Sequence, residues 1–176
     1  SAFTAAGRVE NFTQAFGLSG CEAMAIFIAQ NHGAGEDRRA LRGFLMGSAV
    51  TVGVGIFFSA AMGIFAQPLS HLFLGGGEGM TPCISYLQLI SWFYLLSFFG
   101  NSFVGWFRGT GWMNVTFFGT TLQIAIRVIG TYLLVDSMGL DAVALATGLG
   151  WVAIVLFQTT LFLLQIRSHR PRPSRS

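Results

Sequence analysis

Residues 43–66 read GFLMGSAVTVGVGIFFSAAMGIFA, and this stretch decides the fold class. It contains no charged residue, and about 20 consecutive apolar residues are enough for a helix to cross a bilayer core. Small residues recur at every fourth position and so share one face of a helix. They are Gly43, Gly47, Thr51, Gly55, Ser59 and Gly63. Such a stripe lets another helix approach closely, and it predicts either a fixed helix–helix seam or a surface on which helices slide.

The composition of the whole chain also indicates a membrane protein. Of 176 residues, 53% are hydrophobic and only 10% are charged, whereas a soluble domain carries about 25% charged residues. Residues 79–107 and 142–166 form further charge-free runs that are long enough to span a bilayer. These numbers exclude an ordinary soluble domain.

We predict an all-α, polytopic bundle of five transmembrane helices within residues 1–166. Glycine-rich or charged turns separate the helices, and the second helix is expected to stop at Gln67-Pro68, with residues 69–74 at the membrane surface. Residues 167–176 form a basic, solvated tail. The predicted spans are about 3–30, 43–66, 83–107, 117–135 and 142–166.

The arginines set the orientation of the bundle. Eight of the ten lie in loops or ends on one side, and the opposite turns carry Glu78, Asp136 and Asp141 but no arginine. The positive-inside rule therefore predicts a multi-pass protein of the cell's inner (plasma) membrane, with a cytoplasmic C-terminus and no nucleic-acid partner. The eight are Arg38, Arg39, Arg42, Arg108, Arg167, Arg170, Arg172 and Arg175.

The first helix then begins outside the cell, without an initiator Met or a basic signal segment before it. We expect the chain to be the C-terminal part of a longer polytopic protein.

Motifs for catalysis or cofactor binding are missing from the sequence. Cys21 and Cys83 have no CxxC or histidine partner at metal-binding spacing, so we expect them to be packing residues. The triple glycine at 75–77 lacks the Lys-Ser/Thr of a phosphate-binding loop. His71 and His169 belong to opposite faces of the membrane. We predict no metal site, no cofactor and no enzymatic activity.

The first helix is unusually polar. Glu10, Thr13 and Gln14 occupy one side of its outer half, and a second set of polar residues lies within about 60° of Arg8 on the other side. A helix that is polar on two sides must border protein or a water-filled cavity rather than lipid. We therefore predict that its outer half forms a cavity wall. The second set is Thr4, Arg8, Asn11, Ser19, Glu22 and Gln30.

Arg127 lies near the middle of the fourth span, too deep for its side chain to reach the membrane surface easily. It needs an internal partner, and counting inward from the boundaries puts Glu22 near the same depth and Glu10 close to the outer edge. We predict an Arg127–Glu22 pair. The pair could be a static ion pair or a charge relay that a coupling ion disturbs, and a partner on a helix outside this chain is the alternative.

The third span carries a polar face made of Ser91, Tyr94, Ser97 and Asn101, spaced three to four residues apart. Such side chains in membrane helices serve as interhelical hydrogen-bonding groups more often than as ligands. Asn101 is the costliest of the four to bury and therefore the most suggestive of a functional role.

Three turn motifs resemble the multidrug and toxic compound extrusion (MATE) transporters. Gln30-Asn31-His32-Gly33-Ala34-Gly35 looks like the cytoplasmic Gln-x-x-Gly-Ala-Gly turn of that family, and Arg108-Gly109-Thr110-Gly111 looks like its Arg-Gly-x-Gly loop. Residues 139–147 resemble the turn into its last helix. The order and spacing of the motifs match helices eight to twelve of twelve.

The resemblance implies most of one lobe of a two-lobed secondary antiporter that rocks between inward-open and outward-open states. Such a protein exports cationic or amphipathic drugs in exchange for H+ or Na+, and this chain would require the missing N-terminal lobe. Ser97 stands where many members carry an acid, so the resemblance favours proton coupling through the other lobe. The candidate cavity residues, chosen by position, are Glu10, Gln14, Tyr94, Ser97 and Asn101.

Two other classes of protein remain open at this point. A flippase for lipid-linked precursors would share the rocking lobes, but its pyrophosphate cargo calls for more cationic residues than Arg8 and Arg127. A five-helix membrane scaffold or enzyme would need a metal or nucleophile cluster, which the sequence does not provide.

Overall fold

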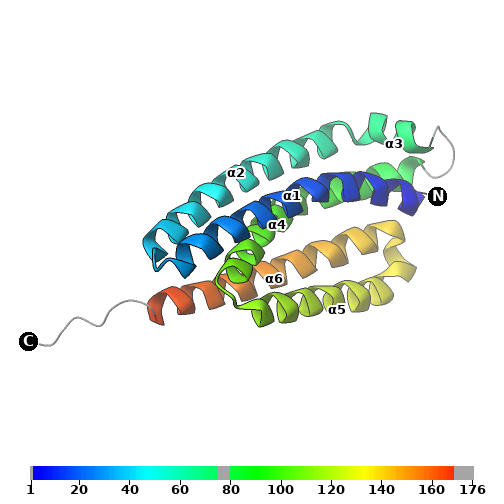
Figure 1. Ribbon diagram of the computed structural model, residues 1–176. Coiled ribbons are helices and arrows are strands. Elements are labelled where there is room, and N and C mark those ends of the chain that lie inside the picture. The colour runs from blue at the N-terminus through cyan, green and yellow to red at the C-terminus, as the bar shows by residue number, and fades with distance from the viewer. Residues whose placement is uncertain (1, 75–79, 169–176) are drawn as a thin grey trace, which may run out of the picture.

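The computed structural model describes residues 2–74 and 80–168, which form helices and no strands (Figure 1). Every helix except the short α3 is long and apolar enough to cross a membrane. The prediction of an all-α bundle with five spanning helices is confirmed. The helices are α1 (Ala2–Gly33), α2 (Asp37–Ile64), α3 (Ala66–Leu74), α4 (Met80–Gly109), α5 (Met113–Met138) and α6 (Leu140–Ser168).

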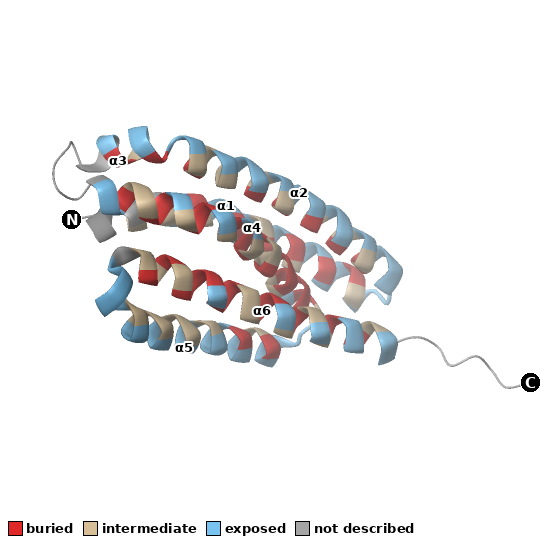
Figure 2. Ribbon diagram, turned by 180° about the vertical axis from the view of Figure 1, so that it is seen from behind, coloured by how far each residue is buried: buried red, intermediate tan, exposed pale blue. Residues whose placement is uncertain are grey.

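Helix α4 is the centre of the bundle. It passes between the α1–α2 pair and the α5–α6 pair (Figure 1) and contacts both. Half of the residues in its most apolar stretch are buried, against 6% in α5. Figure 2 accordingly shows α4 largely buried and α5 largely exposed. Because α1, α4 and α6 run in the same direction, positions along them can be compared directly by depth.

Aromatic side chains fill the core at both ends of α4. Tyr94 and Phe98 lie in one cluster, and Tyr94 packs edge-on against Trp151 of α6 with ring centroids 5.5 Å apart. Phe44 and Phe162 meet the C-terminal half of α4 in a second cluster. Cys21 and Cys83 are fully buried free thiols, which confirms the prediction that they are packing residues.

The helices extend further than the apolar runs predicted. Helix α2 begins at Asp37, so the arginines that follow lie in its first turns rather than in a loop. An apolar run marks the hydrocarbon core, whereas backbone hydrogen bonding continues into the interface, where charged side chains are solvated. The Asp37 carboxylate also favours the helix start through the helix dipole, and it accepts a 2.6 Å hydrogen bond from His32.

The turn after α2 and the turn after α5 are both shorter than predicted. Helix α2 ends at Ile64, and only Phe65 separates it from α3, whereas the break was predicted at Gln67-Pro68. Pro68 lies in the first turn of α3, where it interrupts no helical hydrogen bond. Ser70 is buried, so α3 packs on the bundle instead of lying only at the surface. Between α5 and α6 only Gly139 is non-helical, with a φ of +58°.

The stripe of small residues on α2 is a seam with two partners. In its N-terminal half, Gly47 meets Met24 of α1 and Thr51 lies against Gly20. In its outer half, Gly55 meets Phe98 of α4, and the Ser59 hydroxyl donates to the Ser91 carbonyl oxygen. The predicted helix–helix seam is therefore confirmed.

Several predicted features fall outside the described residues: the triple glycine at 75–77, Glu78, His169, Arg170, Arg172, Arg175 and the side chain of Thr4.

Candidate functional site

The structure brings the five predicted cavity residues to one interface, between α1 and α4. The Gln14 side-chain amide donates a 2.8 Å hydrogen bond to the Ser97 hydroxyl, and the Tyr94 hydroxyl donates at 3.2 Å to the backbone carbonyl of Glu10. Asn101 lies against Gly17, where its amide nitrogen would be 2.7 Å from an added Cβ. We call this interface the α1–α4 polar seam: Glu10, Gln14, Tyr86, Tyr94, Ser97 and Asn101.

The seam exists because α1 and α4 run close together. An added Cβ on Gly105 would lie 2.9 Å from the carbonyl oxygen of Cys21, and one on Gly109 would lie 2.9 Å from that of Ala25. Such approach distances require glycine, since a side chain at either position would push the backbones apart. The parallel contact then sets α1 and α4 in a register that holds along their whole length.

Tyr86 is the seam residue that sequence reasoning missed. Its buried hydroxyl donates a 2.9 Å hydrogen bond to the Glu10 carboxylate. It lies three residues inside the predicted start of the third span, outside the polar face that was predicted from Ser91 to Asn101. A tyrosine two turns from Tyr94 was the only available signal.

A second carboxylate meets α4 next to Tyr86. The Ser85 hydroxyl donates at 2.8 Å to one oxygen of Asp141, the first acidic residue of α6. The other Asp141 oxygen is buried and has no hydrogen-bond partner among the described residues. Consecutive helix residues point about 100° apart, so Ser85 faces α6 while Tyr86 faces α1.

The structure does not form the predicted Glu22–Arg127 pair. Glu22 is exposed on α1, which packs against α4 and α2, whereas Arg127 belongs to α5, which packs mainly against α6. Within the described ranges, the ion pair that the structure shows is His32–Asp37, with 2.6 Å between Nδ1 and Oδ1. The prediction counted depth along each helix separately from its own membrane boundary. In the structure α1 already begins at Ala2, and Glu10 lies level with Tyr94 of α4.

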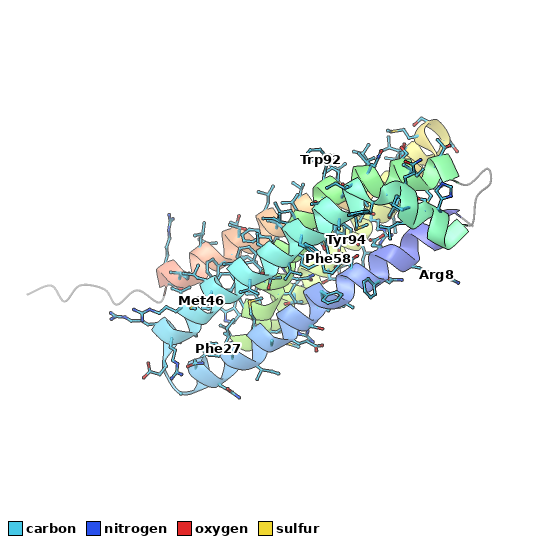
Figure 3. All side chains as sticks on the ribbon, turned by 90° about the horizontal axis from the view of Figure 1, so that it is seen from above. Arg8, Phe27, Met46, Phe58, Trp92 and Tyr94 are labelled. Atoms are coloured by element: carbon cyan, nitrogen blue, oxygen red, sulfur yellow. The ribbon has the colours of Figure 1, made fainter. Side chains whose placement is uncertain are left out.

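The predicted polar stripe of α1 faces away from the seam. Its described members are all exposed, and Figure 3 shows Arg8 projecting from the bundle. In the same view Tyr94 lies inside the bundle, whereas Trp92, which is 82% exposed, projects outward. The exposed members are Arg8, Asn11, Ser19, Glu22 and Gln30.

The Gln30–Gly35 and Arg108–Gly111 motifs form the same kind of helix cap. At the end of α1, the Gly35 N–H donates to the His32 carbonyl and the Glu36 N–H to the Asn31 carbonyl. At the end of α4, Gly111 and Trp112 repeat this pattern. Gly35 and Gly111 have φ values of +76° and +81°, as the capping position of a Schellman motif requires.

The other motif residues have different roles. Gly109 is needed for the close contact with Ala25 described above, and the Gln30 carbonyl accepts the Ala34 N–H. Arg108 is exposed at the arginine-rich end of α4. Nothing in the structure explains Gly33, which has open space around it.

The seam combines one carboxyl group, two amides and three hydroxyls within an apolar bundle. Glu10 and Gln14 are only partly buried, so part of each side chain remains exposed at the edge of the seam. A groove of about 610 Å³ between α2 and α4 lies elsewhere and is lined in part by Ser59, Gln88 and Ser91. Across the described ranges, no cluster of three or more histidine, cysteine or acidic residues could hold a metal ion. The chemistry available at the seam is therefore hydrogen bonding and attraction of a cation.

Comparison with known proteins gives two matches. The MatE family model matches residues 1–133. A solved structure, described as the inward-facing conformation of a multidrug resistance MATE family transporter of the MOP superfamily, superposes with a TM-score of 0.80 at 18% identity. The alignment covers 96% of this chain and 42% of that transporter, so this chain spans less than half of its length. No curated protein matches.

Proposed function

The chain belongs to the MatE (MATE transporter) family, and from that membership we propose that it forms most of one lobe of a secondary antiporter. The full-length protein exports cationic or amphipathic compounds in exchange for H+ or Na+. Its partners are the bilayer, the cationic cargo and a second lobe of the same polypeptide. Membership in a transporter family favours transport over catalysis.

The observation that carries this proposal is the exposed polar stripe of α1. A membrane-spanning helix that exposes Arg8, Asn11 and Glu22 cannot present that side to lipid without a large cost. The stripe must therefore border water or another part of the protein. A second lobe of the same polypeptide, packed against this side of α1, provides that border.

The polar seam on the other side of α1 provides the contact for the cargo. Glu10 is partly buried, and two tyrosine hydroxyls hold its backbone carbonyl and its carboxyl group. A carboxyl held in this way attracts a cation, and neighbouring aromatic faces add cation–π attraction. We propose that Glu10 contacts the positive charge of the cargo and that Gln14 contacts its polar groups.

The coupling ion is proposed to be the proton. Ser97, whose hydroxyl accepts a hydrogen bond from Gln14, stands where the family resemblance places an acid. A neutral hydroxyl and an amide donor leave that position without the negative charge that a sodium ion needs. The acid that binds the coupling proton then belongs to the other lobe.

Reconstitution of the full-length protein tests this function. Liposomes loaded with a pH-sensitive dye receive ethidium, an aromatic cation, on one side, with choline in place of sodium. The proposal predicts ethidium-dependent proton movement that continues without sodium. Movement that requires sodium would overturn the coupling assignment, and the absence of ethidium-dependent flux with either ion would contradict cationic antiport.

A further inference from the structure

Three arginines lie on one exposed side of the first two turns of α2. Arg38, Arg39 and Arg42 are all exposed, and at 100° per residue they fall within an arc of about 100°. The buried residues Ala40 and Phe44 lie on the opposite side of the helix, about 160° from Arg42. The three arginines therefore occupy the side of α2 that faces away from the bundle.

These arginines have no acidic partner among the described residues. The two acids that precede them are Glu36 and Asp37. The Asp37 carboxylate is bonded to His32 at 2.6 Å, and across residues 2–74 and 80–168 neither acid forms an ion pair with an arginine. The guanidinium groups are thus available to an external anion, and their paired N–H donors match the oxygens of a phosphate.

The same side of α2 is apolar directly beyond Arg42. Leu45, Met46 and Val50 are 58%, 72% and 68% exposed, and all three lie within about 80° of Arg42 on the helix. Figure 3 shows Met46 close to the start of α2. Exposed apolar side chains continue to Ile56, so this face is about 16 Å long, close to half of a ~30 Å hydrocarbon core.

The cluster is confined to α2 among the described helix ends. Figure 1 shows the start of α2 and the end of α6 at the same end of the bundle. At this end α4 and α6 carry one described arginine each, Arg108 and Arg167. Only α2 therefore combines several unpaired arginines with an exposed apolar face in the same part of the described chain.

An anionic phospholipid has both chemical parts in the order in which α2 presents them. Its phosphate lies at the membrane surface, its acyl chains run into the hydrocarbon core, and clustered arginines attract anionic headgroups. A soluble phosphate would use the arginines alone, and a zwitterionic lipid carries a cation beside its phosphate. We propose that the three arginines bind the phosphate of an anionic phospholipid, and that its acyl chain lies along α2 from Leu45 to Ile56.

Photolabelling of the full-length protein in neutral detergent tests this site. The probe is phosphatidylglycerol with a diazirine in its acyl chain, and mass spectrometry maps the labelled residues. Label is expected between Leu45 and Ile56. Excess phosphatidylglycerol should remove it, whereas phosphatidylcholine or glycerol phosphate at the same concentration should not.

Three outcomes of this experiment would contradict the proposal. Absence of label between Leu45 and Ile56 overturns it, as another part of the protein covering this face would produce. Equal competition by phosphatidylcholine would show that the site does not recognise the anionic headgroup. Equal competition by glycerol phosphate would show that the apolar face does not contribute to binding.

Charge variants test the arginines themselves. An arginine near an anionic headgroup changes affinity by roughly fivefold, so R42Q should raise the half-saturating probe concentration by about that factor and R38Q/R39Q/R42Q by about tenfold or more. The matched control, R167Q, removes one charge at the same end of the bundle and should leave labelling of α2 unchanged. An unchanged half-saturating concentration in the triple variant overturns the assignment.

The result does not depend on the folding of the variants or on transport. The competition experiment uses the unmodified chain, so its outcomes stand even if the triple variant cannot be purified. Lipid binding is measured without ion flux. Loss of this site would therefore leave the proposed antiport unaffected, and loss of antiport would leave this site unaffected.

Discussion

The side chain of Ser97 determines whether Gln14 has a partner on α4. Their 2.8 Å hydrogen bond joins two helices, whereas the neighbouring Ser102 hydroxyl donates only to the carbonyl of Phe98 in its own helix. Both serines are buried. The Ser97 hydroxyl therefore links α4 to α1, whereas the Ser102 hydroxyl bonds only within α4.

We expect Ser97→Ala to destabilise the full-length protein and Ser102→Ala to have little effect. Interhelical hydrogen bonds in membranes contribute about 0.6 kcal/mol on average, with a maximum near about 1.7 kcal/mol. Unfolding in a graded denaturant series measures the difference. Equal losses for the two variants would show that the Gln14–Ser97 bond adds nothing to the seam.

The capping glycines provide a second test at single residues. Gly111 has a φ of +81° and open space around it, so a side chain there meets backbone strain but no clash. We expect Gly111→Ala to cost about 1 kcal/mol because an L-residue pays this amount in the left-handed region. Gly111→Asn should cost less, since asparagine also occupies this capping position. Thermal unfolding of the two variants measures the order, and an asparagine variant less stable than the alanine variant would contradict the cap.

At the scale of the helix, the contact between α1 and α4 depends on glycine. An alanine at Gly105 would place its Cβ 2.9 Å from the backbone oxygen of Cys21, and the backbone must move to relieve the contact. Gly53 of α2 has nothing within 4 Å and serves as the matched control.

We expect Gly105→Ala to destabilise the protein by about 1–3 kcal/mol through overpacking. Gly53→Ala should be neutral or stabilising by up to about 1 kcal/mol because alanine is the better helix former. Denaturant unfolding of both variants measures the contrast. A tolerated Gly105→Ala would mean that α1 and α4 are not held in the described register.

The existence of the helices could be predicted from the sequence, and their ends could not. Charge-free runs mark the hydrocarbon core, so all five spanning helices were found. The ends lie in the interface, where polar side chains no longer distinguish helix from loop. This is why α2 begins at Asp37 although its apolar run begins at Gly43.

The predicted pairing of Arg127 with Glu22 was wrong for a related reason. Depth can be counted along one helix, but the offset between two helices depends on their contacts. The offset of α1 against α4 is set by glycines such as Gly105, whose partners appear only once the helices pack. The same offset brings Glu10, and not Glu22, close to Tyr86.

At the scale of the whole molecule, the arginine distribution predicts the orientation. Glu36 precedes α2 at the arginine-rich end, whereas Asp136 lies near the outer end of α5. Both are exposed, and the native cysteines are fully buried.

Cysteine labelling in intact cells tests this orientation. A membrane-impermeant maleimide should label Asp136→Cys from outside and leave Glu36→Cys unlabelled until the membrane is opened. The positive-inside rule gives the physical reason, since loops rich in arginine stay in the cytoplasm. The reverse labelling pattern would invert the proposed topology.

Five of the six residues of the α1–α4 polar seam were selected from the sequence, whereas Tyr86 and the contacts within the seam were not. Helical spacing alone grouped Tyr94, Ser97 and Asn101, and the polarity of the first helix identified Glu10 and Gln14. Which of these touch could not be read from spacing, because a polar face in a membrane is compatible with lining a cavity or with packing on a neighbouring helix. The hydrogen bonds show that the two faces meet each other.

The most direct test of the account is ethidium-driven proton flux by the full-length protein carrying Glu10→Gln, measured against Glu36→Gln. A charge-assisted contact contributes about 1.5–3 kcal/mol, so losing the carboxylate should reduce flux by roughly tenfold or more. Glu36 lies exposed outside the spans, and its variant should retain wild-type flux. Folded Glu10→Gln protein that transports as fast as Glu36→Gln would contradict the assignment of the α1–α4 polar seam as the transport site.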